Sequence, residues 1–129
     1  VLRQGDYAWA FYEAALAEMP LLSTKLEETF QALDGAKQRL QNYKDEFYLT
    51  ALSEGVIDGK NAEQRDAQLR GSLNKDVVYL ECASGLQDAE DADRQAKRQW
   101  ELNTIQLQAY RYLVALRTAQ INAVSGKGD

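Results

Sequence analysis

Residues 55–71, with the sequence GVIDGKNAEQRDAQLRG, separate two long segments in which apolar residues recur at helical spacing. Gly55 lies where a glycine commonly ends a helix, because glycine adopts the left-handed conformation without steric cost. A chain that leaves one long helix here and enters another can fold the two helices against each other. We therefore predict that residues 55–73 are a connector that reverses the chain.

The same stretch predicts a short helix inside the connector. Asn61 is a favourable N-cap residue, and Gln64 stands three residues later, as in a capping box. We expect this helix to cover residues 62–70 and to end at Gly71. Ser72 and Asn74 are candidate caps for the helix that follows.

The first segment of the chain is rich in aromatic residues and alanine. Asp6 is a suitable N-cap, and Pro20 disfavours helix at the residue before it, so we expect a separate N-terminal helix over 6–19. Its apolar side chains fall on two faces. Those faces are covered either by the chain's own long helices or by another copy of the chain.

Two long helices are predicted on either side of the connector, over 20–54 and 74–123. Each carries apolar residues every seven positions, with a second row at matching positions, as in a coiled coil or helix bundle. In the first helix the main row is Leu26, Leu33, Leu40 and Phe47, and in the second it is Tyr79, Leu86, Trp100, Leu107, Val114 and Ile121. Polar residues interrupt these rows at Thr29, Thr50, Asp93, Asn103 and Arg117.

These elements predict an all-α fold, a long antiparallel helical hairpin, in a single domain over 1–129. Residues 124–129 are expected to be a frayed tail. The chain has 129 residues, 45% of them hydrophobic and 27% charged, which is usual for one folded domain. No apolar run is long enough to span a membrane, and Val1-Leu2-Arg3 does not open a secretory signal, so we expect a cytoplasmic protein.

A second apolar stripe follows residue 100, formed by Leu102, Ile105, Ala109, Leu113 and Leu116. The hairpin brings this stripe to the same end as the aromatic N-terminal segment. That end then has more apolar surface than one hairpin hides, which predicts a homo-oligomer. The residues expected at the oligomer interface are Trp9, Phe11, Tyr12, Trp100, Leu107 and Leu113.

Most enzyme chemistry lacks its usual residues in this chain. There is no histidine, which removes the commonest general base and ordinary zinc sites, and no phosphate-binding glycine motif occurs. The carboxylates Asp88, Glu90, Asp91 and Asp93 cluster on the second helix. Asp88 and Asp91 have one spacing found in all-helical, magnesium-dependent nucleotide pyrophosphatases, but the full pattern is missing from both helices. We favour a solvated face paired with Arg94, Lys97 and Arg98, and expect no catalytic residue, metal or cofactor.

Two further features concern binding. The single cysteine, Cys82, excludes an intramolecular disulfide framework and lies at a core-facing position, so we expect a structural thiol. The net charge of −5 argues against a dedicated binder of duplex DNA. Residues 55–75 nevertheless hold basic residues that fit either capping and the helix dipole or a contact with nucleic-acid phosphates. They are Lys60, Arg65, Arg70 and Lys75.

The connector pattern Gly59-x-Asn61-x-x-x-Arg65-x-x-x-Leu69 resembles that of small helical-hairpin proteins encoded by bacteriophages, often among recombination and replication genes. The resemblance covers the turn and, by pattern alone, the flanking helices. It implies a phage-like origin and an accessory role in DNA metabolism, and it supplies no catalytic residues.

Three classes of function follow from these expectations. The first is a non-enzymatic, self-associating helical scaffold or adaptor. The alternative is an accessory factor in phage-type recombination or replication that contacts single-stranded DNA or a DNA-bound protein. A pyrophosphatase-like enzyme ranks third.

Overall fold

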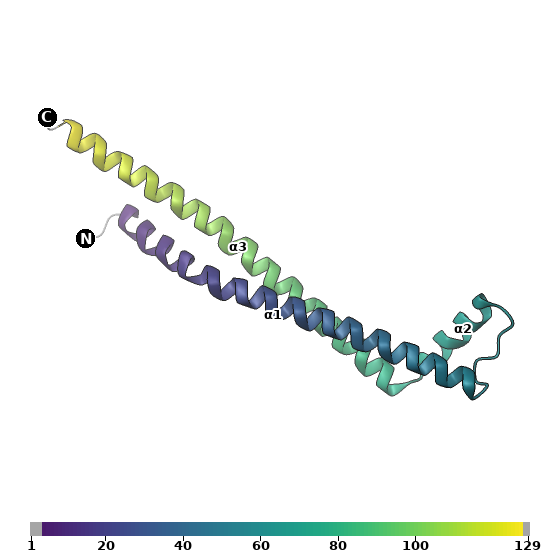
Figure 1. Ribbon diagram of the computed structural model, residues 1–129. Coiled ribbons are helices and arrows are strands. Elements are labelled where there is room, and N and C mark those ends of the chain that lie inside the picture. Colours follow the sequence, from purple (N-terminus) through teal and green to yellow (C-terminus); the bar gives the residue numbers. More distant parts are fainter. Residues whose placement is uncertain (1–3, 128–129) are drawn as a thin grey trace. The chain divides into compact units, whose positions relative to one another are not determined.

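A computed structural model of the chain describes residues 4–127, and the side chains of residues 7–126. These residues form three helices and no strand: α1 (Gln4–Ser53), α2 (Ala62–Leu73) and α3 (Val77–Lys127) (Figure 1). The long helices α1 and α3 pack against each other, and α2 lies in the connector between them. The prediction of an all-α helical hairpin is confirmed.

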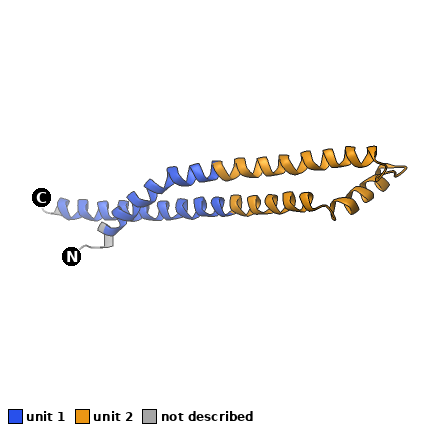
Figure 2. Cartoon of the chain, turned by 90° about the horizontal axis from the view of Figure 1, so that it is seen from below, with its two compact units in different colours: residues 1–27, 95–129 blue, residues 28–94 orange. Residues whose placement is uncertain are grey.

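The chain divides into two compact units, and each long helix contributes to both (Figure 2). Unit 1 is built from residues 1–27 and 95–129, and unit 2 from residues 28–94. Unit 2 contains the connector. The prediction of a single domain stays a prediction.

In both units the helices meet along a seam with alternating steps of three and four residues. The buried and half-buried positions of unit 1 include Ala8, Tyr12, Ala15, Met19, Leu22 and Leu26 on α1, and Ala96, Trp100, Asn103, Leu107, Tyr110, Val114 and Arg117 on α3. In unit 2 they include Thr29, Leu33, Ala36, Leu40, Tyr43 and Phe47 on α1, and Tyr79, Cys82, Leu86, Ala89 and Asp93 on α3. The predicted seven-residue rows therefore lie at the helix contact, except at Ile121, which is 50% exposed.

Among the apolar residues of this seam only alanines are buried, because two helices cover each other along one line. The buried apolar residues of the long helices are Ala8, Ala15, Ala36, Ala51 and Ala96. The larger apolar residues of the seam keep part of their surface exposed. Packing by alanine brings two helix backbones close together.

The predicted break at Pro20 is wrong, because residues 4–53 form one continuous helix. The separate helix over 6–19 is therefore the first part of α1, and Asp6 lies inside the helix instead of capping it. Proline removes one backbone donor and leaves the carbonyl four residues earlier without its helical partner. Pro20 lies on the exposed side of α1, where water can take that role.

Several helix ends differ from the predicted ones. Helix α2 continues through Gly71 to Leu73, and α3 begins at Val77, where the Tyr79 N–H donates to Asp76 Oδ1 over 2.9 Å. Asp76 therefore does the work expected of Ser72 or Asn74. Helix α3 also continues to Lys127, so residues 124–127 are not a frayed tail. Residues 128–129 of that predicted tail lie outside the described residues.

The connector begins with the predicted glycine cap. Gly55 has φ of 76°, its N–H donates to the Leu52 carbonyl, and the Val56 N–H donates to the Ala51 carbonyl. This pair of bonds is the Schellman arrangement, which satisfies carbonyls that the helix end would leave unpaired. It also turns Ile57 inward, where the side chain is only 2% exposed. Ala51, instead of the expected Thr50, continues the buried row here.

Candidate interaction surface

Unit 1 exposes an unusual number of large apolar side chains. On α1 these are Tyr7, Trp9, Phe11, Leu16 and Leu21, and on α3 they are Leu102, Ile105, Tyr112, Leu113, Leu116, Ile121 and Val124. Their positions within the helical repeat place them on more than one side of the unit. Monomeric proteins seldom expose so much adjoining apolar surface without a use for it.

The side of α1 that carries Phe11 adjoins α3. The Phe11 and Tyr110 rings are 5.5 Å apart between centroids. A shallow hollow of about 230 Å³ lies between the helices, lined by Phe11, Ala14, Ala15, Glu18, Asn103, Gln106 and Tyr110. We call it the unit 1 groove. Its floor is formed by seam residues, so it is a surface depression with no buried charged group.

A second apolar region lies on the side of α3 that faces away from α1. Its members are spaced three and four residues apart but are offset by two positions from the seam. We call them the outer stripe: Leu102, Ile105, Ala109, Tyr112 and Leu116. Ile105 and Tyr112 are 62% and 68% exposed, so neither finds cover within the chain.

The six predicted interface residues do not share one environment. Trp9, Phe11 and Leu113 are exposed, at 52%, 51% and 39%. Tyr12, Trp100 and Leu107 are half-buried in the seam within the chain. The Trp9 ring lies beside the Tyr12 ring of its own helix, tilted by 36°, with ring centroids 6.0 Å apart. Only the first three residues are therefore well exposed for a partner, and the structure leaves self-association itself a prediction.

Sequence reasoning missed Tyr112 and Leu21 as exposed apolar residues of unit 1. Tyr112 could have been found, because it follows Ala109 by three residues and precedes Leu116 by four. Its place in this row was hidden by Leu113, which follows it and was taken as the member of the stripe. Leu21 had a similar signal, because it follows Ala17 by four residues and Ala14 by seven.

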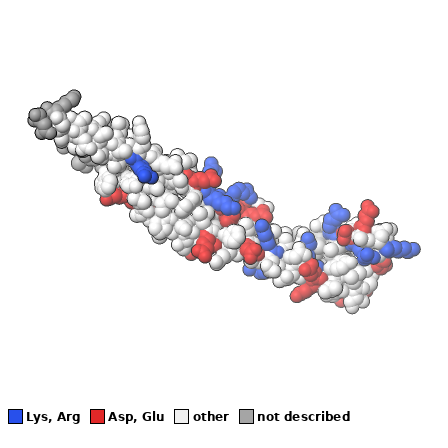
Figure 3. Space-filling model, turned by 45° about the horizontal axis from the view of Figure 1, so that its top comes forward, with Lys and Arg blue, Asp and Glu red and all other residues white. Residues whose placement is uncertain are grey.

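Charged residues are sparse where this apolar surface lies. Between Leu102 and Gly126, α3 carries only Arg111 and Arg117. In Figure 3, the part of unit 1 next to the grey terminal residues is largely without charged side chains on the face shown. A surface with few charges loses little hydration when it is covered.

The polar residues that interrupt the seam are held by hydrogen bonds across it. In unit 2 the Thr29 hydroxyl donates to Asp93 Oδ1 over 3.4 Å, and both residues are buried. In unit 1 the Asn103 amide donates to the Ala15 carbonyl over 3.1 Å and contacts Met19 Sδ at 3.0 Å. Each unit thus has a polar contact that joins α1 to α3 and fixes the register of the two helices.

The residues of the phage-like pattern hold the connector together. Asn61 Oδ1 accepts from the Gln64 N–H over 2.8 Å, which confirms the predicted N-cap of α2. Gln64 Oε1 accepts in return from the Lys60 N–H, one residue before the position that a capping box would use. A Cβ on Gly59 would meet Gln64 Cβ at 2.8 Å, so a side chain does not fit there.

Arg65, one of the four basic candidates, is committed partly to the connector. Its guanidinium donates to the Gly59 carbonyl over 3.2 Å, while the Gly59 N–H donates to Gln68 Oε1 over 2.9 Å. The other three candidates, Lys60, Arg70 and Lys75, are exposed. Arg70 also lines a shallow hollow of about 290 Å³ with Lys44, Asp66, Leu69, Leu73, Asn74 and Tyr79.

A hydrogen bond between Tyr43 and Asp76 ties α1 to the start of α3. The Tyr43 hydroxyl donates to Asp76 Oδ1 over 2.7 Å. This bond, followed by burial, raises the pKa of Tyr43 to about 12. The Tyr79 backbone N–H, and then the Tyr43 hydroxyl, lower the pKa of Asp76, because both donate to its charged form.

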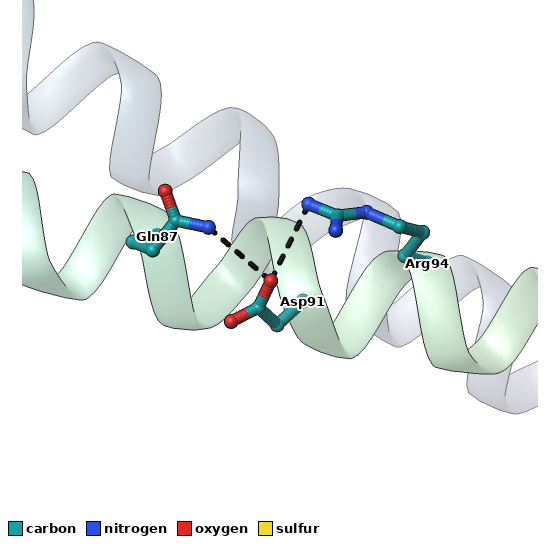
Figure 4. A network of polar contacts seen from close by, with 3 residues as sticks. All are labelled: Gln87, Asp91 and Arg94. Carbon is teal, nitrogen blue, oxygen red and sulfur yellow. Dashed lines mark hydrogen bonds and ion pairs between the residues drawn. The ribbon is translucent and has the colours of Figure 1, made fainter.

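The carboxylates on α3 have separate surroundings. Asp91 Oδ1 forms an ion pair with Arg94 over 3.3 Å and accepts from the Gln87 amide over 3.2 Å (Figure 4). This matches the predicted solvated face. Asp93 differs from that prediction, since it is buried in the seam beside Thr29. Within residues 7–126, no three metal-binding side chains of His, Cys, Asp or Glu come together.

Cys82 is half-buried in the seam of unit 2, as its core-facing position predicted. It lines a small hollow with Ala36, Arg39, Glu81 and Gly85. Gly85 leaves the space beside it open, since a Cβ there would meet nothing within 4 Å.

Comparison of the chain with protein-family models, curated proteins and solved structures gives no match. The likeness to phage hairpin proteins therefore rests on the connector residues alone. In the part of the chain that the structure describes, no helix combines the length and the apolar character needed to cross a lipid bilayer.

Proposed function

We propose that the protein is a non-enzymatic helical scaffold or adaptor that associates with itself through the apolar surface of unit 1. The observation that supports this proposal is the set of large apolar side chains that both helices of this unit leave exposed. A scaffold needs extended surfaces, and the exposed apolar side chains of both helices in unit 1 supply them.

The size of the effect can be judged from individual side chains. Full burial of a large apolar side chain is worth roughly 1.5–3 kcal/mol. Phe11 and Leu113 are already partly covered, at 51% and 39% exposure, so each would gain less than that on association. Several such residues together are needed to offset the cost of joining two chains.

The experiment is a measurement of molar mass by light scattering over a micromolar concentration series. We expect a dimer or larger form, and a shift to monomer for the variant with Phe11→Asp and Leu113→Asp. Leu49→Asp is the matched control, since Leu49 is an exposed apolar residue of unit 2. A wild-type chain that stays monomeric throughout the series would contradict the proposal.

A second candidate is an accessory factor in phage-type DNA recombination or replication. It is favoured by the exposed basic side chains of Lys60, Arg70 and Lys75 around α2. Binding through phosphates should weaken steeply as salt rises. Fluorescence anisotropy with a labelled single strand should then show a loss of binding for the three Glu variants combined, with Arg111→Glu in unit 1 as control. Equal binding by all of these proteins, or none, would remove this candidate.

A further inference from the structure

The outer stripe of α3 has the spacing of a second coiled-coil seam. Leu102, Ile105, Ala109, Tyr112 and Leu116 follow steps of three, four, three and four residues, and Ala119 and Ala123 continue the same steps. The first seam of α3, which packs on α1, has the same steps two residues earlier. Helix α3 is therefore built to contact one helix on each of two sides.

We propose that the outer stripe pairs with the outer stripe of a second copy of this chain, antiparallel and about a twofold axis. The inference rests on the proposed self-association and names the surface and geometry that would produce it. The assembly would place the two α3 helices in the centre, with each α1 on the outside.

Antiparallel pairing of the stripe with itself matches a large residue with a small one in two of the three pairs of the register below, and two large residues in the third. In an antiparallel register centred between residues 110 and 111, Leu102 faces Ala119 of the second copy and Ala109 faces Tyr112 of the second copy. Ile105 then faces Leu116 of the second copy. Cores fill without voids when large and small side chains alternate in this way. The match arises from the order of residues along α3.

Charge favours a second copy over a charged partner. A twofold axis brings identical residues near each other, so a self-pairing surface must avoid like charges. The positions that flank the stripe are uncharged over its length after Glu101, and they are Gln106, Gln108, Leu113, Ala115, Gln120 and Asn122. Arg111 follows Ala109 by two residues, so it lies about 200° around the helix from it and away from the stripe.

The other exposed apolar surfaces of unit 1 suit this role less well. The unit 1 groove is lined partly by Glu18, whose charge a twofold contact would bring near its own copy. Trp9 and Leu16 lie one helical repeat of seven residues apart on a different side of α1 and form only a short row. The outer stripe, with Ala119 and Ala123, extends over seven exposed apolar positions of α3.

The inference is tested by disulfide formation in the full chain with Cys82→Ser as background. The variant with Leu102→Cys and Ala119→Cys should form a covalent dimer on air oxidation, because each new thiol would face the other residue in the second copy. Within one chain these two positions are roughly 25 Å apart along the helix, so they cannot join each other. Leu102→Cys alone and Ala119→Cys alone are the controls and should not form the dimer.

Each outcome has a distinct meaning when the molar mass is measured alongside. A dimer that crosslinks only in the double variant supports the antiparallel stripe. Crosslinking by either single variant would indicate a parallel arrangement and overturn the inference. A dimer by light scattering without any crosslink would overturn the inference but leave the scaffold proposal in place, and a monomer would remove both.

Substitution at the stripe gives an independent measurement. Combined Leu102→Gln, Ile105→Gln and Leu116→Gln should weaken the dimer by about a hundredfold or more in dissociation constant. Trp9→Gln with Leu16→Gln, on the other side of the unit, should change it less than tenfold. Helix content by circular dichroism should be unchanged in both, since all five side chains are exposed. The reverse order of effects would place the contact on the Trp9 side.

Discussion

The two units are built from the same pair of helices but differ in their polar contacts and in how many large apolar side chains they expose. Unit 2 contains the connector, whose backbone groups and polar side chains bond to one another around Gly59, Asn61 and Gln68. The described residues of unit 1 form no such cluster and instead leave a row of large apolar side chains exposed on α3. Unit 2 also exposes large apolar residues, among them Phe30, Leu49 and Val77, but unit 1 exposes more of them, and on α3 they form a continuous row.

The largest expected effect on this contrast comes from Ile57, the most deeply buried large side chain of the connector. Ile57→Ala should lower the free energy of unfolding by about 2–5 kcal/mol, since it leaves a cavity under the turn. Chemical denaturation followed by circular dichroism measures this. Leu116→Gln in unit 1 is the control, expected within about 0.5 kcal/mol for the dissociated chain because the residue is exposed. Equal losses in both variants would contradict the contrast.

Alanine substitutions at two glycines of the connector should change stability in opposite directions, because close packing decides the effect at Gly59 and helix propensity decides it at Gly71. Gly59→Ala should destabilise by about 1–3 kcal/mol, because its Cβ would meet Gln64 Cβ at 2.8 Å and the Arg65 nitrogen at 2.9 Å. Gly71→Ala should stabilise by about 1 kcal/mol, since Gly71 lies within α2 and its Cβ would meet nothing within 4 Å. Thermal unfolding of both variants gives the comparison. A gain in stability from Gly59→Ala would refute the packing described around it.

The N-cap of α2 is the next smaller effect. Asn61→Ala should cost about 1 kcal/mol, because the Gln64 N–H would lose its acceptor. Asn61→Asp retains an oxygen that can accept this bond and should keep most of the stability. Urea titration distinguishes the two variants, and an equal loss in both would show that the side-chain oxygen is not what matters.

The smallest effect is the pH dependence of the bond between Tyr43 and Asp76. The fold lowers the pKa of Asp76. The stabilisation of the folded state by the ionised Asp76 carboxylate is therefore complete above the ordinary carboxyl pKa of about 4 and is lost as the pH falls below that value. The fold raises the pKa of Tyr43 from 10.0 to about 12. The stabilisation of the folded state by the protonated Tyr43 hydroxyl is therefore lost as the pH rises through this interval. Tyr43→Phe should flatten the alkaline limb in a series of melting temperatures, and an unchanged limb would contradict this assignment.

The hairpin could be predicted because its evidence is repeated many times along the chain. Each heptad of the two long helices indicates the same pairing of helices. Gly55 and Asn61 indicate the turn by their local chemistry alone. The prediction at Pro20 failed because a single local signal was set against a long helical context. One lost backbone bond on an exposed side is a small cost beside the packing of the whole helix.

The candidate surface could be predicted only in part. Heptad positions show which residues can face a partner helix, but they do not say whether that partner is the same chain. Trp100 and Leu107 were therefore predicted as oligomer-interface residues, although both are half-buried in the seam within the chain. The polar seam residues Asp93 and Asn103 looked like interruptions, because their hydrogen-bond partners lie far away in the sequence.

Those polar seam contacts have a consequence for how the hairpin folds. Two helices with seven-residue repeats can also meet after sliding past each other by one repeat, and small alanine side chains offer little resistance to such a slip. A slipped hairpin would bury Thr29, Asp93 or Asn103 without the partner each now has, at about 1–3 kcal/mol for each unpaired group. Misaligned states should therefore be short-lived in the natural chain. In a variant with leucine at these positions they should accumulate and appear as additional slow refolding phases.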